Sequence, residues 1–499
     1  MTDTPTLADW RARAAAFAPR SRALIDGRWR DAASGATFDA ISPLDGRQLA
    51  AVAAGDAPDI DAAVAAARAA FDRGDWSRST PRHRKQVLLR LAELIRAHRD
   101  ELALTETLDM GKPISDSLAV DIPSTANCIQ WYAEAVDKVY DEIAPTGPDS
   151  LALVTREPQG VIGAVVPWNF PLIMAAWKVG PVLAAGNSLV LKPSEKSPLS
   201  ALRLGELALE AGLPAGVFNV VPGFGHTAGR ALALHPDVDG IAFTGSTATG
   251  KLVMGYAAQS NLKRVSLECG GKSPNVVLAD WRDVARVARA SAFAIFFNQG
   301  EMCSAGSRLI VHESLKDALL DEIDKVAREL APGDPLDPAT RLGAIVDRPQ
   351  MERVLGYIQA GRDDGARLRL GGRQLRQESG GCFVEPTVFD GVKPSMRIAR
   401  EEIFGPVLST LTFRTEDEAI ALANDSHYGL AAAVWTPDLK SAHRVSRALR
   451  AGVVYVNCYD ADDITVPFGG FRQSGMGRDK SLHAFDKYTE LKTTWIDLT

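Results

Sequence analysis

Cys303 lies in a small, polar turn of residues 298–306, which separates two apolar stretches of the chain. Residues 292–297 before the turn are strongly apolar, and residues 308–311 after it are expected to form a strand. A cysteine at the edge of a turn can meet a substrate and find hydrogen-bond donors that stabilise its thiolate. Because free cysteines are often buried and inert, this segment alone leaves a reactive thiol and a structural one equally open.

Other polar groups with catalytic potential follow expected strands. Asn169 stands between two prolines, where a fixed amide N–H could stabilise an oxyanion, although a turn asparagine more often bonds its own backbone. Glu268 ends an apolar strand before a Gly-Gly turn, a setting that suits a general base. A carboxylate that only caps the loop is the equal alternative. Lys192 and Glu195 end another strand, where they could bind ribose hydroxyls or form a solvated pair.

Two motifs indicate a bound nucleotide. Gly245 and Ser246 lie where a strand gives way to a helix, and backbone N–H groups at a helix start bind phosphate. The spacing is not the usual G-x-G-x-x-G pattern, so this motif is weak by itself. Glu402 and Phe404 belong to a Glu-Glu-Ile-Phe-Gly-Pro turn, where they could hold the ribose and ring of a cofactor. Paired acids in a loop are, however, usually solvated.

The elements that must position these residues alternate regularly. Residues 161–268 alternate short β-rich runs with Ala/Leu-rich helical segments, which is typical of a parallel, doubly wound sheet that binds ligands at its strand ends. A second alternating set begins near residue 290 and carries Cys303. Residues 59–110 and 121–140 are expected to be helical. Residues 488–497 are expected to form an exposed strand, which either pairs with another subunit or lies at the edge of its own domain.

Composition narrows the classes of protein that remain. The chain has 499 residues, 46% of them apolar, so it can bury a large core divided into domains. A net charge of −6 without a basic run excludes a nucleic-acid binder. Five scattered cysteines indicate neither a metal site nor a disulfide framework. No apolar stretch is long enough to span a membrane. The Ala/Arg-rich segment 7–22 is interpreted as a helical arm, and the expected location is cytoplasmic.

In combination, these motifs resemble the NAD(P)-dependent aldehyde dehydrogenase superfamily. The resemblance extends from about Ile25 to the terminal strand, with seven motifs in family order: residues 167–171, 192–195, 243–246, 267–272, 299–303, 401–406 and 467–470. It implies two doubly wound α/β domains and a small β oligomerisation element. The implied divisions are a Rossmann-like NAD-binding domain (1–140 and 159–269), a catalytic domain (270–475) and oligomerisation strands (141–158 and 484–499) of a homodimer or homotetramer.

The resemblance also implies a role for each matched residue. Cys303 is the nucleophile that forms a thiohemiacetal and then a thioester, and Asn169 stabilises the oxyanion with the Cys303 backbone N–H. Glu268 activates water, and its presence favours a free acid over transfer to coenzyme A. Lys178 and Asp479 match a proton path, although the family often has Glu in place of this aspartate. The implied cofactor-binding residues are Pro167, Trp168, Lys192, Ser194, Glu195, Gly245, Ser246, Glu402 and Phe404. Glu195 favours NAD, since a carboxylate would repel the 2′-phosphate of NADP, which remains the weaker alternative.

The loop of residues 457–466 suggests which aldehyde is oxidised. It contains three acids, and Asp462 stands where relatives that oxidise apolar aldehydes typically carry an aromatic residue. The expected substrate contacts are Phe170, Met174, Trp177, Asp121, Tyr459, Asp460, Asp462 and Phe468. Acids and aromatic rings together favour a cationic tail, and the chain resembles the branch that oxidises γ-glutamyl-aminobutyraldehyde and other amino- or guanidino-aldehydes. If the acids are solvated rim residues, a broad aliphatic or aromatic preference is expected instead.

A different class of function is a thiol hydrolase or acyltransferase that uses Cys303 without a cofactor. Such an enzyme needs a histidine beside the thiol. None of the eight histidines belongs to the loops around Asn169, Glu268 or Cys303. A non-catalytic relative is disfavoured because all three of these residues are intact.

Overall fold

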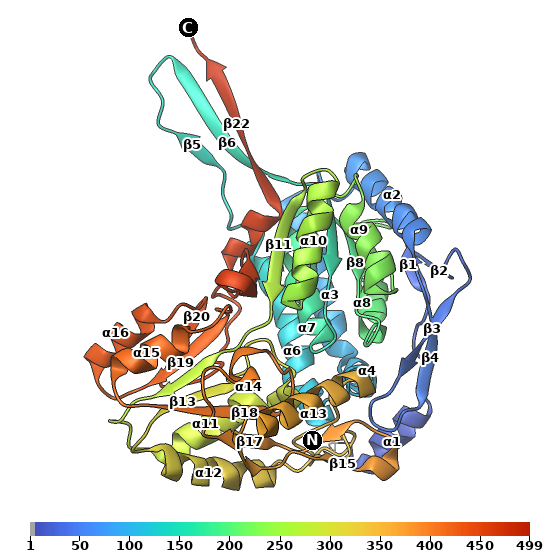
Figure 1. Ribbon diagram of the computed structural model, residues 1–499. Coiled ribbons are helices and arrows are strands. Elements are labelled where there is room, and N and C mark those ends of the chain that lie inside the picture. The colour runs from blue at the N-terminus through green and yellow to red at the C-terminus, as the bar shows by residue number, and fades with distance from the viewer. Residues whose placement is uncertain (1–4) are drawn as a thin grey trace.

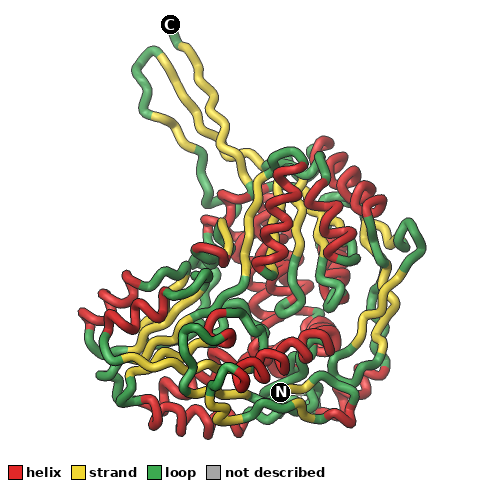
Figure 2. Tube along the Cα trace, in the orientation of Figure 1, coloured by secondary structure: helices red, strands yellow, loops and turns green. Residues whose placement is uncertain are grey.

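The structure is a computed structural model that describes residues 5–499. Two sheets with helices packed against them lie side by side, and a long β arm projects away from both (Figures 1 and 2). Most of the first sheet is built from the chain before residue 270, and the second sheet is built from the chain after it. Their junction is the segment of residues 270–273, which follows the strand that carries Glu268.

The first sheet has eight strands in the order β2-β1-β9-β8-β7-β10-β11-β21. Its bounds are β1 (Ala23–Ile25), β2 (Arg28–Arg30), β7 (Val161–Val165), β8 (Ser188–Lys192), β9 (Phe218–Val220), β10 (Gly240–Gly245), β11 (Arg264–Cys269) and β21 (Gly475–Met476). The five central strands, β9 to β11 in this order, are parallel. Strand β8 is buried at every position, as expected for a parallel strand covered on both faces.

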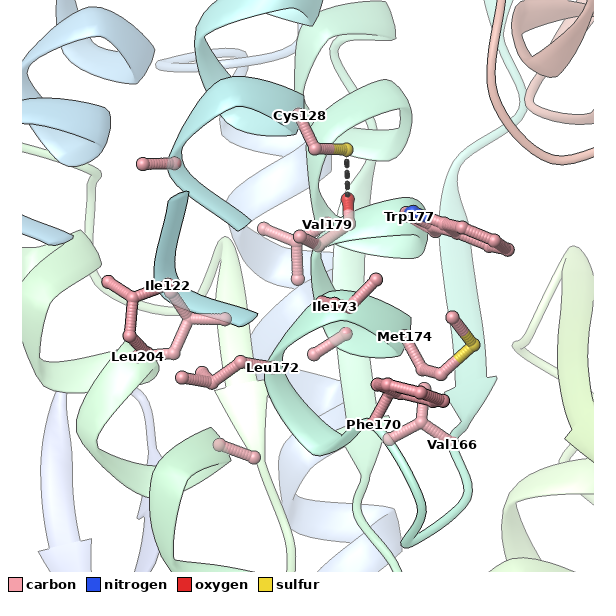
Figure 3. Close-up of a cluster of buried hydrophobic side chains, with 14 of the residues drawn as sticks. Ile122, Cys128, Val166, Phe170, Leu172, Ile173, Met174, Trp177, Val179 and Leu204 are labelled. Carbon is pink, nitrogen blue, oxygen red and sulfur yellow. Dashed lines mark hydrogen bonds between the residues drawn. The ribbon is translucent and has the colours of Figure 1, made fainter. Parts of the chain in front are cut away.

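Helices pack against this sheet and contribute to its core. They are α1 (Leu7–Ala15), α2 (Ala57–Arg73), α3 (Pro81–Ala97), α4 (Arg99–Met110), α5 (Ile114–Asp116), α6 (Ile122–Ala135), α7 (Pro171–Ala185), α8 (Leu199–Glu210), α9 (Arg230–Leu234) and α10 (Thr247–Gln259). Helix α7 is buried from Pro171 to Ala184. Figure 3 shows it within the apolar cluster that it forms with α6 and neighbouring segments. The hairpin of β3 (Thr37–Ile41) and β4 (Gln48–Ala53) is separate from the sheet.

The second sheet has seven strands in the order β14-β17-β18-β13-β12-β19-β20, and only β14 is antiparallel to its neighbour. The strands are β12 (Pro274–Val277), β13 (Arg308–His312), β14 (Arg367–Leu370), β17 (Thr387–Asp390), β18 (Val407–Phe413), β19 (Ala431–Trp435) and β20 (Val453–Val456). The helices are α11 (Val284–Phe296), α12 (Lys316–Glu329), α13 (Arg348–Asp363), α14 (Arg397–Arg400), α15 (Glu416–Asn424) and α16 (Leu439–Ala448). A small hairpin joins β15 (Gln374–Leu375) to β16 (Phe383–Val384).

The projecting arm consists of β5 (Glu142–Ala144), β6 (Ser150–Pro158) and β22 (Thr489–Asp497), in the order β22-β6-β5. The terminal strand pairs with β6 of its own chain over nine residues. The other edge of β22 has no strand partner in the part of the chain that the structure describes. The predicted division into an NAD-binding domain, a catalytic domain and oligomerisation strands stays a proposal. The presence of two separate large sheets and a projecting arm supports it.

Four element predictions were wrong in detail. The helical arm expected over 7–22 ends at Ala15, and the helical stretch expected over 59–110 is three helices, α2, α3 and α4, with residues 74–80 outside any helix. The second alternating set begins at Pro274 rather than near residue 290, because the four-residue strand β12 is too short to show a pattern. The helix expected over 121–140 ends at Ala135 and is preceded by one turn of π-helix, Ser117–Asp121. In residues 5–499, no helix is long and apolar enough to cross a membrane.

Candidate active site

The turn before Cys303 has an unusual backbone. Asn298, Gln299 and Gly300 are consecutive residues in the left-handed region, with φ angles of 48°, 57° and 72°. Residues other than glycine rarely adopt this backbone conformation, which costs about 1–3 kcal/mol where the surrounding structure imposes it. A Cβ on Gly300 would lie 2.3 Å from the backbone of Gly405. The turn is therefore a strained segment that its surroundings hold in place.

Hydrogen bonds attach this turn to the end of strand β7. The side-chain amide of Asn298 donates to the carbonyl oxygens of Asn169 (3.0 Å) and Glu301 (3.2 Å). The Asn169 amide donates in return to the Glu301 carbonyl at 2.9 Å. The second N–H of the Asn169 amide makes no hydrogen bond to another described residue. Asn169 is thus held at the end of β7 by hydrogen bonds to the turn that carries Cys303, and its predicted role stays a prediction.

Cys303 lies where two cavities meet. The first, here called the Trp168 cavity, has a volume of about 260 Å³ and is lined by Pro167, Trp168, Asn169, Met174, Lys196, Thr244, Gly245, Ser246, Glu268, Gly270, Cys303, Gln350, Arg353, Glu402 and Phe404. The second, here called the Trp177 cavity, has a volume of about 370 Å³. Met174 and Cys303 line both. A group bound in one cavity and a group bound in the other would therefore meet at the sulfur.

The Glu268 carboxyl is buried at the end of β11, and its Oε1 atom has no hydrogen-bond partner among the described residues. Burial raises the pKa of Glu268 to about 8, against the opposing charge of Lys178. A carboxyl with this pKa can both accept and release a proton near neutral pH, which is what a general base requires.

The Cys303 thiol also resists ionisation. Burial raises the pKa of Cys303 well above its ordinary value, and the neighbouring carboxyls of Glu268 and Glu402 add to this. A thiol in this environment is neutral at pH 7. A positive charge next to the sulfur would favour the thiolate.

Lys178, predicted to lie behind the base, forms a buried ion pair with Asp479, and Lys487 binds the other oxygen of the same carboxylate. Although burial would raise the pKa of Asp479, the two lysines hold it below its ordinary value. The two predicted members of the proton path are therefore in contact, and Asp479 is ionised.

Two aromatic rings meet in the Trp168 cavity. Trp168 and Phe404 pack edge to face with ring centroids 5.2 Å apart. Phe404 has a left-handed backbone (φ 60°), and its carbonyl accepts a hydrogen bond from the Gln350 amide at 2.8 Å. Glu402 accepts a hydrogen bond from the Gly271 backbone N–H at 3.0 Å, and burial raises its pKa to about 7. These residues form an aromatic and acidic part of the wall of the cavity that Glu268 also lines.

The start of helix α10 forms another part of this cavity. The Ser246 hydroxyl accepts a hydrogen bond from the Thr249 backbone N–H at 3.2 Å and so caps the helix. The buried hydroxyl of Thr244 lines the cavity and has no hydrogen-bond partner in residues 5–499. An unpartnered polar atom beside a helix N-terminus fits an anionic ligand such as a phosphate.

Lys192 and Glu195 form an ion pair of 2.9 Å at the end of β8, with the lysine buried. The Lys192 carbonyl lies next to the 167–171 turn, since it accepts a hydrogen bond from the Val166 N–H at 3.2 Å. Lys192, Ser194 and Glu195 do not line the Trp168 cavity. Their predicted contact with a cofactor stays a prediction.

Comparison with known proteins identifies the family. Residues 29–494 match the aldehyde dehydrogenase family. The NADP/NAD-dependent aldehyde dehydrogenase PuuC of Escherichia coli (strain K12) is 54% identical over 492 residues, which cover 99% of both chains. The aminoacetaldehyde dehydrogenase of Pseudomonas aeruginosa is 54% identical over 498 residues, which cover 100% of both.

Solved structures agree with this assignment. An indole-3-acetaldehyde dehydrogenase complexed with NAD+ and the γ-glutamyl-γ-aminobutyraldehyde dehydrogenase of Burkholderia cenocepacia J2315 each have a TM-score of 0.98 and 62% identity, covering 99% of this chain and 100% of the other. This chain belongs to the aldehyde dehydrogenase family. The predicted fold class and the predicted aldehyde dehydrogenase activity are thereby confirmed.

Two predicted substrate contacts of this aldehyde dehydrogenase were wrong. Asp121 is fully buried, ion-paired with Lys112, and does not line the Trp177 cavity. Tyr459 is also buried outside this cavity, and its hydroxyl donates to the Ser304 carbonyl at 2.8 Å. Both residues are close to the cavity in sequence, but their side chains turn into the protein, where each finds a polar partner.

The other predicted contacts line the Trp177 cavity, namely Phe170, Met174, Trp177, Asp460, Asp462 and Phe468. Met174 and Trp177 lie on one side of α7 (Figure 3), as their spacing of three residues requires. Asp460 accepts a hydrogen bond from the Ser304 hydroxyl at 3.1 Å, and burial raises its pKa. This aldehyde dehydrogenase therefore does place acids and aromatic rings around one cavity that ends at Cys303.

The structure also assembles residues that sequence reasoning missed. In the Trp168 cavity these are Lys196, Thr244, Gly270, Gln350 and Arg353. In the Trp177 cavity they are Val120, Ser124, Asn127, Cys128, Ile173, Phe293, Phe297, Met302, Ser304, Tyr455, Asp463, Ile464 and Lys480. Most stand on helices or loops without any local motif. Five carried a signal that could have been used: Thr244, Gly270 and Met302 lie inside family motifs, Asp463 lies inside the acidic loop, and Lys480 lies beside Asp479.

Replacing Gly300 with alanine should disable the turn that carries Cys303, because its left-handed φ and the adjacent Gly405 backbone leave no room for a Cβ. We expect a loss of about 1–3 kcal/mol in the free energy of unfolding and a lower yield of titratable Cys303 thiol. Gly356→Ala is the matched control, since that glycine lies inside α13 with nothing within 4 Å of its Cβ position. Equal stability of both variants in thermal unfolding would contradict the argument.

Proposed function

We propose that this enzyme oxidises an amino-aldehyde to a carboxylic acid on the sulfur of Cys303, using NAD. The observation that carries the proposal is the position of Cys303 on the wall of both cavities, with the Glu268 carboxyl on the Trp168 side. A thiol that faces both an oxidant and an aldehyde can hold the acyl group between oxidation and hydrolysis. Each of the two steps then has its own catalyst.

The steps follow from the groups around the sulfur. The Cys303 thiol first loses its proton to water, and the resulting thiolate sulfur bonds to the aldehyde carbon while the Asn169 amide and the Cys303 backbone N–H stabilise the oxyanion. The oxyanion collapses to a carbonyl, and the hydrogen on this carbon leaves with its electron pair, which leaves a thioester. Glu268 then takes a proton from water, the water oxygen attacks the thioester, and the acid departs with release of the Cys303 thiolate. Lys178 and Asp479 pass on the proton that Glu268 accepts.

NAD supplies the two-electron oxidant when it is bound. The Trp168 cavity fits such a group, since it combines the α10 N-terminus, the unpartnered Thr244 hydroxyl and the aromatic wall of Phe404. Ser246 and Gly245 would lie by the pyrophosphate, Glu402 and Phe404 would hold the nicotinamide half, and Pro167 and Trp168 would border it. Lys192, Ser194 and Glu195 would bind the adenosine ribose, where the carboxylate disfavours the extra phosphate of NADP. Solved relatives include NAD+ complexes.

The charge of the Trp177 cavity supports an amino-aldehyde substrate. Asp460, Asp462 and Asp463 line this cavity together with one cation, Lys480. The formal charge is therefore −2, which attracts a cationic tail. Names of relatives point in the same direction, since one is an aminoacetaldehyde dehydrogenase and another a γ-glutamyl-γ-aminobutyraldehyde dehydrogenase. A broad preference for aliphatic or aromatic aldehydes is the second candidate, because the indole-3-acetaldehyde dehydrogenase is equally similar.

A thiol hydrolase without cofactor is the weaker alternative. It requires a histidine that activates the thiol, and no histidine among the described residues lines either cavity. Glu268 is the titratable group next to the sulfur instead.

Replacing Cys303 with alanine should abolish aldehyde-dependent NADH formation, because no other group can carry the acyl intermediate. NAD binding, measured by calorimetry, should remain within about two-fold, since the sulfur forms only a small part of the Trp168 cavity. The half-buried Cys458 provides a control, and Cys458→Ala should keep its turnover. Residual turnover in the Cys303 variant above about one hundredth of the wild-type rate would rule out the nucleophile assignment.

Replacing Glu268 with glutamine should separate the two steps. The pre-steady-state NADH burst should persist, while the later steady rate should fall by about 10²–10⁴-fold because general base catalysis is lost. The base acts as a carboxylate, and the Glu268 pKa is about 8. The wild-type rate after the burst should therefore rise between pH 7 and 9, and the variant should lack this rise. A variant that keeps the same pH dependence would contradict the role of Glu268.

We further propose that the arm joins subunits into a dimer or tetramer. Its terminal strand has one edge without a strand partner in residues 5–499, and it exposes Leu491, Trp495 and Ile496. An exposed strand edge with apolar side chains favours pairing with a second copy.

We also propose a cytoplasmic location, which is supported by the five cysteines, all of which are free thiols.

Trp495→Asp should lower the oligomer mass measured by light scattering, because a charge in an apolar contact cannot be buried without a partner. Leu439→Asp is the matched control, since Leu439 is similarly exposed but lies on α16, away from the arm. A wild-type mass equal to one chain, or the same mass in all three proteins, would refute the proposal.

A further inference from the structure

Lys480 occupies an aromatic site in the wall of the Trp177 cavity. Its ammonium nitrogen lies 5.5 Å from the Trp177 ring centroid and 5.6 Å from the Phe468 ring centroid. The side chain is only 2% exposed. All three residues line the Trp177 cavity. The rings that were expected to bind a cationic substrate tail are therefore already in contact with a cation of the protein itself.

The backbone holds Lys480 in this place from two sides. Lys480 and Ser481 both have left-handed backbones, with φ angles of 60° and 51°. The preceding residue, Asp479, exchanges two backbone hydrogen bonds of 2.7 and 2.8 Å with Phe468. The Ser481 N–H donates to the Ile464 carbonyl at 2.8 Å. Strain of this kind persists only where the surroundings impose it, and it is common at functional sites.

Lys480 also offsets part of the negative charge of the 457–466 loop. Its ammonium group donates to the Asp462 carboxylate and, at 3.1 Å, to the Asp463 carbonyl oxygen. The Asp463 carboxylate is engaged elsewhere, since it accepts hydrogen bonds from Thr465. Asp460 and Asp463 therefore remain as the two carboxylates of the cavity that Lys480 does not bind.

We propose that Lys480 is a specificity-determining residue that limits the preference of this cavity for cationic aldehydes. It lies against the rings of Trp177 and Phe468, which pack on each other with centroids 5.3 Å apart, and it offsets the charge of Asp462. Selection for a cationic tail then depends on Asp460 and Asp463. The inference relies on the proposed function only in that the aldehyde is oxidised in the Trp177 cavity.

Substitutions can therefore change the formal charge of the Trp177 cavity in single steps. The three carboxylates and Lys480 give −2 in the wild type. Lys480→Met gives −3 and frees the aromatic site, Asp462→Asn gives −1, and the double variant returns to −2. Near a protein surface, one unit charge a few ångströms away changes an ionic interaction by about ten-fold or more in equilibrium terms.

Two aldehydes of equal shape isolate the charge of the tail. They are 4-(trimethylammonio)butyraldehyde and its neutral isostere 5,5-dimethylhexanal, and the measured quantity is the ratio of their kcat/KM values. The ratio cancels any change in Cys303 chemistry, which affects both substrates equally. We expect Lys480→Met to raise the ratio about ten-fold and Asp462→Asn to lower it about ten-fold. The double variant should return to within about three-fold of the wild type.

Controls separate charge from packing. Lys480→Arg keeps the charge and should keep the ratio, whereas Lys492→Met removes an exposed lysine of the arm and should change nothing. Thermal unfolding identifies a variant that loses its fold. If Lys480→Met does not fold, Asp462→Asn still tests the inference, since it leaves the Lys480 charge unopposed.

The outcomes also distinguish this inference from the proposed substrate class. A wild-type ratio of one or less, with a rise in Lys480→Met, would reject the amino-aldehyde preference and support the role of Lys480. A wild-type ratio well above one that stays constant or falls in Lys480→Met would overturn the role of Lys480. An unchanged or higher ratio in Asp462→Asn would overturn it as well.

Discussion

The contact between the Cys303 turn and the end of strand β7 is the constraint on which the rest of the site depends. Three left-handed residues bring the chain to Cys303, and the Asn169 and Asn298 amides fix this turn through the Glu301 carbonyl. The turn belongs to the second sheet and Asn169 to the first. The sulfur therefore lies where the two halves meet, and it can line a cavity on each side.

Burial decides the chemistry of the groups around this point. Glu268 and Glu402 are buried with few partners, which raises the pKa of each toward neutrality. Asp479 is equally buried but has two lysines, so its pKa is lowered instead. The pKa of a buried carboxyl group is thus raised in one place and lowered in another, and the number of nearby cations makes the difference.

Aromatic and charged residues line the Trp177 cavity together. Trp177 and Phe468 make the cavity apolar, while Asp460 and Asp463 make it acidic. Lys480 contacts both kinds of group, because an ammonium ion interacts favourably with ring faces and with carboxylates. Specificity in such a cavity depends on the balance of its charges as much as on its shape.

The sequence by itself determined the family, the alternating α/β architecture and the identity of the central polar residues. It could do so because strand ends, proline-flanked turns and glycine pairs are local features with local causes, as the segments around Asn169, Glu268 and Ser246 show. Only the tertiary structure decided which acids line the Trp177 cavity. Asp121 and Tyr459 turned inward to Lys112 and Ser304, and Lys480 turned toward the rings. Side-chain direction in a loop depends on partners that are distant in sequence, so spacing alone does not contain it.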